Sequence, residues 1–284
     1  MTSAPRFGPE LIGPKLGDGD MGAVYKAGHV ETREMVALKI LDQFDLPGQY
    51  DREAAVELIE FAGTLQHPRL HPIIAALESE EAGGRIGIVM PLATGGSLWD
   101  HLKSGRKIPP REAWQLIASI ANGVNFLHGQ EVAHGSLKPS NVLLDNDGTP
   151  TLTDLPMAHL RESGLVPPQP TELHQHFLRL ESDYNSPPTI QGDVFALAGL
   201  TYTILAGRLP FNDPHPNARS IPEPAGLPAA IYSVLLRGLT NRTQLRYPSV
   251  VAFLQDLKGA REGKIDPQTA QWFTVTVDEP SEEE

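Results

Sequence analysis

The sequence predicts an α+β protein with two lobes, a small strand-rich lobe followed by a larger helical one. Two observations support this class. Short apolar runs alternate with glycine turns in the first third, and apolar residues recur at helical spacing in the remainder. A length of 284 residues is enough for both lobes to have a core. We place the domain at residues 10–260, with the small lobe at about 10–91, the large lobe at about 94–260, and a cleft between them.

In the small lobe, residues 11–41 are predicted to form a hairpin followed by a third strand at 35–41. A helix is predicted over 51–65, because Ala55, Ile59 and Ala62 recur on one side. The prolines at 68 and 72 end that helix. Residues 85–90 are predicted to form another strand.

In the large lobe, Pro109 and Pro110 open a predicted helix over 111–128. Two short strands around 142–144 and 151–153 flank a turn at 146–148. Residues 157–188 contain five prolines and little periodicity, which is typical of a long functional loop. Helices are predicted at about 193–206, 228–240 and 248–259. Residues 261–284 are predicted to be an acidic tail or linker.

Composition excludes several function classes. The net charge of −12 argues against nucleic acid or an anionic membrane surface as the main partner. The chain has no cysteine, which rules out disulfides and thiolate chemistry. No apolar run approaches the roughly 20 residues that span a bilayer, and the first nine residues lack an apolar signal core. We expect a cytoplasmic protein.

The eight residues at 134–141, HGSLKPSN, carry the strongest functional signal. They resemble the catalytic loop of protein kinases, His-Arg-Asp-Leu-Lys-x-x-Asn, in which the Asp accepts the substrate proton. Ser136 stands at the Asp position and Gly135 at the Arg position. A serine hydroxyl is neutral and cannot serve as a ready carboxylate base. The resemblance therefore implies a bilobal kinase fold that lacks its catalytic residue, a pseudokinase similar to bacterial serine/threonine kinases of the eukaryotic type.

A glycine-rich turn supports the resemblance. Residues 17–24 fit G-x-G-x-x-G-x-V, with Gly17, Gly19, Gly22 and Val24 at the fixed positions. Such a turn can close over phosphates because glycine has no Cβ. The carboxylates of Asp18 and Asp20 either point inward and repel a triphosphate, or lie at a solvated loop tip.

The resemblance assigns Lys39 to the nucleotide phosphates, held by a helix glutamate. Glu57 is the first choice for that partner and Glu53 the second. The alternative is that Glu53, Glu57 and Glu60, which share one helix face, are all exposed.

The segment 86–93 resembles the strand and hinge that lead out of a kinase small lobe. In that resemblance Met90 is the gatekeeper, and the backbone of Pro91 and Ala93 faces an adenine. Proline removes one N–H donor but keeps its carbonyl, the acceptor that the adenine amino group would need. Four residues would form the apolar sandwich around the base: Leu16, Val24, Ala37 and Leu143.

The resemblance also implies ATP and Mg²⁺ as ligands. Lys138 lies on the phosphate side, and Asn141 and Asp154 are separated as the two magnesium ligands of a kinase are. Two oxygen donors plus phosphate oxygens suit Mg²⁺. The Asp-Phe-Gly motif reads Asp154-Leu155-Pro156, and its proline is expected to stiffen the segment.

Other departures concern the large lobe. Asp193 matches the helix aspartate that caps the catalytic-loop backbone. Pro188 replaces the anchor glutamate that would pair with Arg246. Gly135 replaces the arginine whose cation would bind the phosphate of a phosphorylated activation loop. His67 and His71 are spaced i, i+4, but each precedes a proline, which argues against a zinc site on one helix face.

These features leave three hypotheses. The first is a catalytically deficient pseudokinase that binds ATP and serves protein partners as a signalling or scaffolding module. The second is a working enzyme, either a slow serine/threonine kinase or another ATP-using transferase. The third is an interaction domain without nucleotide, and a broken Lys39–Glu57 pair would favour it.

Overall fold

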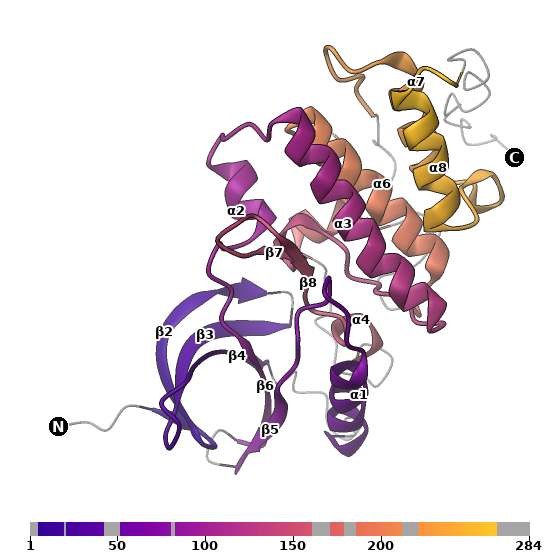
Figure 1. The fold of residues 1–284 in the computed structure, drawn as a ribbon. Coiled ribbons are helices and arrows are strands. Elements are labelled where there is room, and N and C mark those ends of the chain that lie inside the picture. The colour runs from indigo at the N-terminus through magenta and orange to yellow at the C-terminus, as the bar shows by residue number, and fades with distance from the viewer. Residues whose placement is uncertain are drawn as a thin grey trace, which may run out of the picture.

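The computed structural model describes residues 5–19, 21–42, 52–80, 83–160, 171–178, 186–211 and 221–265. They form the two lobes shown in Figure 1, a curved sheet with one flanking helix and a helical lobe, with the β7–β8 hairpin near their junction. In the described part of the chain, no helix combines the length and apolar character needed to cross a membrane.

The small lobe is a six-stranded antiparallel sheet in the order β1-β2-β3-β4-β6-β5. Its strands are β1 (Arg6–Phe7), β2 (Glu10–Gly19), β3 (Gly22–His29), β4 (Met35–Leu41), β5 (Ala75–Ser79) and β6 (Arg85–Pro91). The register sets Lys39 on β4 opposite Val24 on β3 and Ile88 on β6. Helix α1 (Arg52–Thr64) lies beside the sheet and buries Ala55, Ile59 and Ala62.

The large lobe is built on helices. Its elements are α2 (Leu98–Lys103), α3 (Pro110–Gly129), the 3₁₀ turn η2 (Pro139–Asn141), β7 (Val142–Leu144), β8 (Pro150–Leu152), α4 (Met157–Leu160), α5 (Glu172–Gln175), α6 (Ile190–Ala206), α7 (Ala229–Gly238), the 3₁₀ turn η4 (Thr243–Leu245) and α8 (Val250–Arg261).

Helix α6 is the centre of this lobe. Every residue from 193 to 204 is buried, which is expected for a helix that is apolar on all sides. The Thr189 hydroxyl accepts a hydrogen bond from the Gly192 amide at 3.0 Å and caps the N-terminus. Gly207 ends the helix in the left-handed region, with φ 67°. The helix thus gives a rigid base for the residues at its first turn.

The predicted elements agree with the structure over most of the described chain. The strand at 35–41 is confirmed, and the helix predicted at 51–65 is α1. Helix α6 begins three residues earlier than predicted, because Thr189 caps it. Several short elements were not predicted, among them β1, β5 and the two 3₁₀ turns. Helix α2 was not predicted either; its six residues are fixed by a capping box between Ser97 and Asp100.

The long loop predicted at 157–188 contains two short helices, α4 and α5. Residues 161–170 and 179–185 of this loop lie outside the described residues. Residues 266–284, most of the predicted tail, also lie outside them. The domain bounds 10–260 stay a prediction.

Candidate functional site

A cleft of about 640 Å³ lies where the two lobes meet. The predicted nucleotide-binding residues line it, except for Gly22 and Glu57. The lining includes Leu16, Gly17, Gly19, Val24, Ala37, Lys39, Met90, Pro91, Ala93, Lys138, Asn141, Leu143 and Asp154. The cleft is also lined by residues that the sequence did not single out for it, among them His71, Trp99 and Thr171. Its volume lies within the usual range of small-molecule sites, about 300–1,000 Å³.

The glycine-rich turn joins β2 to β3 and covers one end of the cleft. A Cβ on Gly19 would lie 3.2 Å from the Lys39 Nζ, so the turn approaches the ammonium closely. Gly22 has φ 146°, and a Cβ there would lie 2.1 Å from the Ile40 carbonyl oxygen. Only glycine fits that position. Asp18 lines the cleft, is exposed, and forms an ion pair with Lys15; Asp20 lies outside the described residues.

Lys39 and Asp154 form a buried ion pair at the base of the cleft. The Lys39 Nζ lies 2.7 Å from the Asp154 Oδ2, and the two side chains are 2% and 14% exposed. Asp154 is held at φ 66°, a conformation that costs energy for a residue with a Cβ. A buried lysine needs such a partner because an unpaired buried charge is strongly destabilising.

The structure does not bring Glu57 to Lys39. Glu53, Glu57 and Glu60 on α1 are all exposed, as the alternative for this helix face expected. In the described part of the chain, the ion pair of Lys39 is the one with Asp154. The Lys39 ammonium, which Glu57 was expected to hold, is therefore paired with a carboxylate from the large lobe.

Ser136 is buried and bound to its neighbour in the loop. Its side chain and backbone both accept from the Asn141 amide nitrogen, with distances of 3.1 Å to Oγ and 2.7 Å to the carbonyl oxygen. Ser136 as a whole is 3% exposed. Within the described residues, the carboxylates that line the cleft are Asp18, Asp100 and Asp154. Each has a partner of its own, since Asp100 caps α2 through Ser97.

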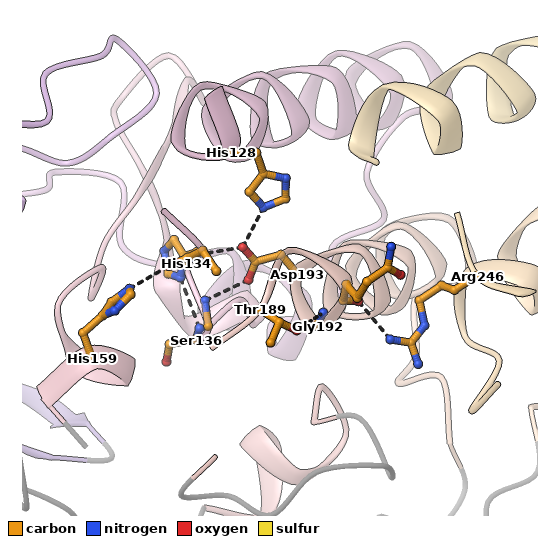
Figure 2. Close-up of polar contacts among 11 residues, drawn as sticks. His128, His134, Ser136, His159, Thr189, Gly192, Asp193 and Arg246 are labelled. Carbon is orange, nitrogen blue, oxygen red and sulfur yellow. Dashed lines mark hydrogen bonds and ion pairs between the residues drawn. The ribbon is translucent and has the colours of Figure 1, made fainter. Parts of the chain in front are cut away.

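Asp193 ties the loop to the two central helices, as Figure 2 shows. Its carboxylate accepts from the backbone amides of His134 at 2.7 Å and Gly135 at 2.8 Å. The His128 Nε2, from the end of α3, lies 2.8 Å from the same carboxylate. The sequence analysis predicted that Asp193 caps the backbone of this loop, but it missed the contact with His128. Because Asp193 is only 1% exposed, this network sets the shape of the loop around Ser136.

Gly135, the residue at the arginine position, is packed too tightly for any side chain. It has φ 67°, and a Cβ would lie 2.4 Å from the Pro188 Cβ and 2.6 Å from the Ala158 Cβ. Pro188 is the residue at the anchor-glutamate position. The two departures from the kinase pattern are therefore neighbours in space, and Pro188 fills part of the space that a side chain at position 135 would need.

Arg246 is buried and donates to backbone carbonyls. Its Nη2 lies 2.7 Å from the Thr240 oxygen and its Nη1 lies 2.9 Å from the Gln191 oxygen. Its guanidinium also stacks over the Phe195 ring, with 5.1 Å between the guanidinium carbon and the ring centre. The contacts with Gln191 and Phe195 bind α6 to the segment before α8, and Figure 2 shows Arg246 beside the first turns of α6.

A second cavity lies behind Met90. Its volume is about 10 Å³, and its lining includes Met90, Leu155 and His71. This is at the lower limit of the space that one water molecule needs, about 10–15 Å³. Leu155 is buried in the core of the large lobe, so the apolar plug expected of the Asp154-Leu155-Pro156 motif is present.

The chemistry of their donor atoms shows whether the two predicted metal ligands, Asn141 and Asp154, suit Mg²⁺. In the described residues, no group of three or more His, Cys, Asp or Glu side chains gathers to hold a metal ion. Asn141 and Asp154 both line the cleft. One carboxylate and one amide fit a Mg²⁺ ion that takes its other ligands from phosphate and water. The Lys39 contact engages only the Asp154 Oδ2, so the carboxylate keeps a second oxygen that can accept the cation.

Comparisons with known proteins agree with this geometry. Residues 12–237 match the protein kinase domain family. The chain is 26% identical over 271 residues to the probable serine/threonine-protein kinase MARK-C of Dictyostelium discoideum, covering 90% of this chain and 33% of that protein. It is 30% identical over 210 residues to the testis-specific serine/threonine-protein kinase 3 of Mus musculus, covering 71% of this chain and 75% of that protein.

A solved structure shows the same fold. The crystal structure of the Mycobacterium tuberculosis PknI kinase domain superposes with a TM-score of 0.71 at 21% identity, covering 92% of this chain and 99% of that one. The match to MARK-C spans only a third of that protein's length. The family match and the two-lobed fold, a sheet followed by a helical lobe, both indicate a protein kinase domain. This chain belongs to the protein kinase domain family.

Proposed function

We propose that this kinase domain binds ATP with Mg²⁺ in the interlobe cleft, transfers phosphate feebly or not at all, and serves protein partners as a signalling or scaffolding module. The observation that carries the proposal is Ser136, a buried neutral hydroxyl at the position of the catalytic Asp, bonded to Asn141. A positioned base contributes about 10²- to 10⁴-fold to a rate. Loss of this base would slow phosphate transfer by that factor but would leave the nucleotide cleft intact.

Three features support nucleotide binding. The cleft has the volume of a small-molecule site, and its walls hold the expected apolar residues Leu16, Val24, Ala37 and Leu143. Lys39 supplies a buried cation under the glycine turn. Asn141 and Asp154 supply two oxygen donors for Mg²⁺. When bound, Mg²⁺ would neutralise phosphate charge.

A slow serine/threonine kinase is the second candidate. The observation in its favour is that Lys39, Asn141 and Asp154 all line one cleft, because electrostatic stabilisation by such groups dominates phosphoryl transfer. The relatives reported above are named as serine/threonine kinases.

A nucleotide-free interaction domain is the third candidate. It is favoured by the exposure of Glu57 and by the pairing of Lys39 with Asp154. In this case the buried ion pair is a structural element and the cleft has lost its role.

The test combines binding and transfer. ATP should raise the melting temperature of the unaltered protein, and more so with Mg²⁺ than without it. Transfer of labelled phosphate to generic protein substrates should be close to background. Ser136→Asp should raise that transfer by about 10²-fold or more, whereas Ser136→Asn, of matched size but without a base, should not.

The outcomes separate the three candidates. Strong transfer by the unaltered protein, abolished by Lys39→Ala and by Asp154→Ala, would establish the working kinase and reject the deficient one. Absence of any thermal shift with ATP, with or without Mg²⁺, would reject nucleotide binding and support the interaction domain.

A further inference from the structure

His71 lies beside Pro91 in the cleft, where the kinase resemblance places the adenine. It lines both the cleft and the small cavity behind Met90. Its Nε2 lies 2.9 Å from the Pro91 carbonyl oxygen, and its Nδ1 lies 3.2 Å from the Thr151 hydroxyl oxygen. The imidazole therefore bridges the hinge and strand β8.

The partners fix which nitrogen carries the proton. A carbonyl oxygen can only accept, so the Nε2–H donates to Pro91. The Nδ1 then accepts from the Thr151 hydroxyl, which can donate. Burial lowers the pKa of His71 below its ordinary value of 6.5, which favours the neutral ring with a single N–H.

The Pro91 carbonyl is the acceptor that the kinase resemblance assigns to the amino group of adenine. Pro91 has no N–H to offer in exchange. In this chain the same oxygen already accepts a hydrogen bond from inside the protein. An incoming 6-amino group has to share that oxygen or displace the imidazole, and a displaced imidazole would also lose its bond to Thr151.

We propose that His71 is a selectivity-determining residue of the cleft: by donating to the Pro91 carbonyl, it removes the preference of the site for purine nucleotides that carry a 6-amino group. The unaltered protein then binds adenine nucleotides weakly and hardly better than a purine nucleotide without that group. This inference rests on the proposed nucleotide binding and specifies which base chemistry the site reads.

The competing explanation is structural. His71 would only hold the hinge to β8 through Thr151 and Pro91, with no effect on the choice of base. A change that removes its N–H would then alter stability, or the affinity for every nucleotide alike.

The experiment compares ATP with purine riboside 5′-triphosphate, which differs only by lacking the 6-amino group. Each is titrated calorimetrically into the unaltered protein, His71→Leu and His71→Gln. Leucine removes the donor, whereas the glutamine amide keeps an N–H near the Nε2 position and is the matched control. Urea unfolding of each variant checks that it is folded.

We expect the unaltered protein to bind the two nucleotides within about twofold of each other. His71→Leu should bind ATP about three- to tenfold more tightly, the range of one neutral hydrogen bond, with the purine riboside compound unchanged. His71→Gln should behave as the unaltered protein does.

Three results would overturn the inference. One is a preference of the unaltered protein for ATP of more than tenfold, a result that needs no variant. Another is an equal gain for both compounds in His71→Leu, which is a steric effect. The third is no gain for ATP in a folded His71→Leu. If neither the unaltered protein nor His71→Leu binds any nucleotide, the proposed function itself fails and this inference fails with it.

Discussion

The contact between Gly135 and Pro188 gives a stability prediction that can be worked out from the structure. Gly135→Ala adds one methyl group at a position with φ 67° and with two carbon atoms within 2.6 Å of the new Cβ. Both effects are unfavourable. A non-glycine residue in the left-handed region costs about 1–2 kcal/mol, and overpacking costs about 1–3 kcal/mol. We expect a loss of about 3 kcal/mol in the free energy of unfolding.

Urea unfolding followed by circular dichroism measures this loss. With an m-value of about 3 kcal/mol/M, the midpoint should fall by about 1 M. Gly148→Ala is the matched control, because Gly148 has φ 81° but no atom within 4 Å of the added Cβ. Its free energy of unfolding should fall only by the cost of a left-handed backbone at a non-glycine residue, about 1 kcal/mol.

A double-mutant cycle isolates the contact. Pro188→Gly removes one of the two carbons that meet the new methyl group, so the loss caused by Gly135→Ala should be about 1 kcal/mol smaller in that background. If Gly135→Ala costs no more than Gly148→Ala, or if the two changes are additive, the reasoning about mutual packing is refuted.

Two further predictions concern buried polar groups. Lys39→Met and Asp154→Asn should each lower the free energy of unfolding by about 3 kcal/mol, because each leaves the partner of the 2.7 Å pair uncompensated. The double variant should lose less than the sum, and additive losses in urea unfolding would mean that the pair contributes nothing. The second prediction is acid sensitivity, because burial is the main cause that lowers the pKa of His71 and of His134 below 6.5. The unfolded chain binds protons on these rings from about pH 6.5 downward while the folded chain does not, so stability should be full above that pH and fall as the pH decreases toward the lowered values. His134→Gln should reduce this pH dependence between about pH 7 and pH 5, and an unchanged slope would contradict the assignment to this ring.

The helices and strands that were predicted correctly are mostly those with a clear local pattern of apolar residues. Helix α1 follows from the spacing of Ala55, Ile59 and Ala62, which it buries. Strand β4 follows from a nearly continuous apolar run, and every residue from 36 to 41 is buried. Helix α2 was missed because six residues carry too little periodicity, and its capping box was the only local signal. Strand β5 was missed for a related reason: it is only five residues long, and most of its length is half-buried.

The site was harder to predict where contacts join distant segments. The cleft lining followed from motif spacing, but the exchange of Glu57 for Asp154 as the partner of Lys39 depends on where α1 and the large lobe lie. His128 gave no local signal, because its role exists only through Asp193, 65 residues away. His71 was weighed only as a zinc ligand, since nothing near it in the sequence indicates the hinge carbonyl 20 residues away.

The cavity behind Met90 has a consequence for chemical probes of this protein. Its 10 Å³ leaves no room for even one aromatic ring, so compounds that extend past the gatekeeper would have to push Met90 or Leu155 aside. Flat, compact heterocycles that stop at the hinge suit this cleft better than elongated ones. A fragment screen should therefore return short planar scaffolds, with those that also donate to the Pro91 oxygen gaining little from doing so.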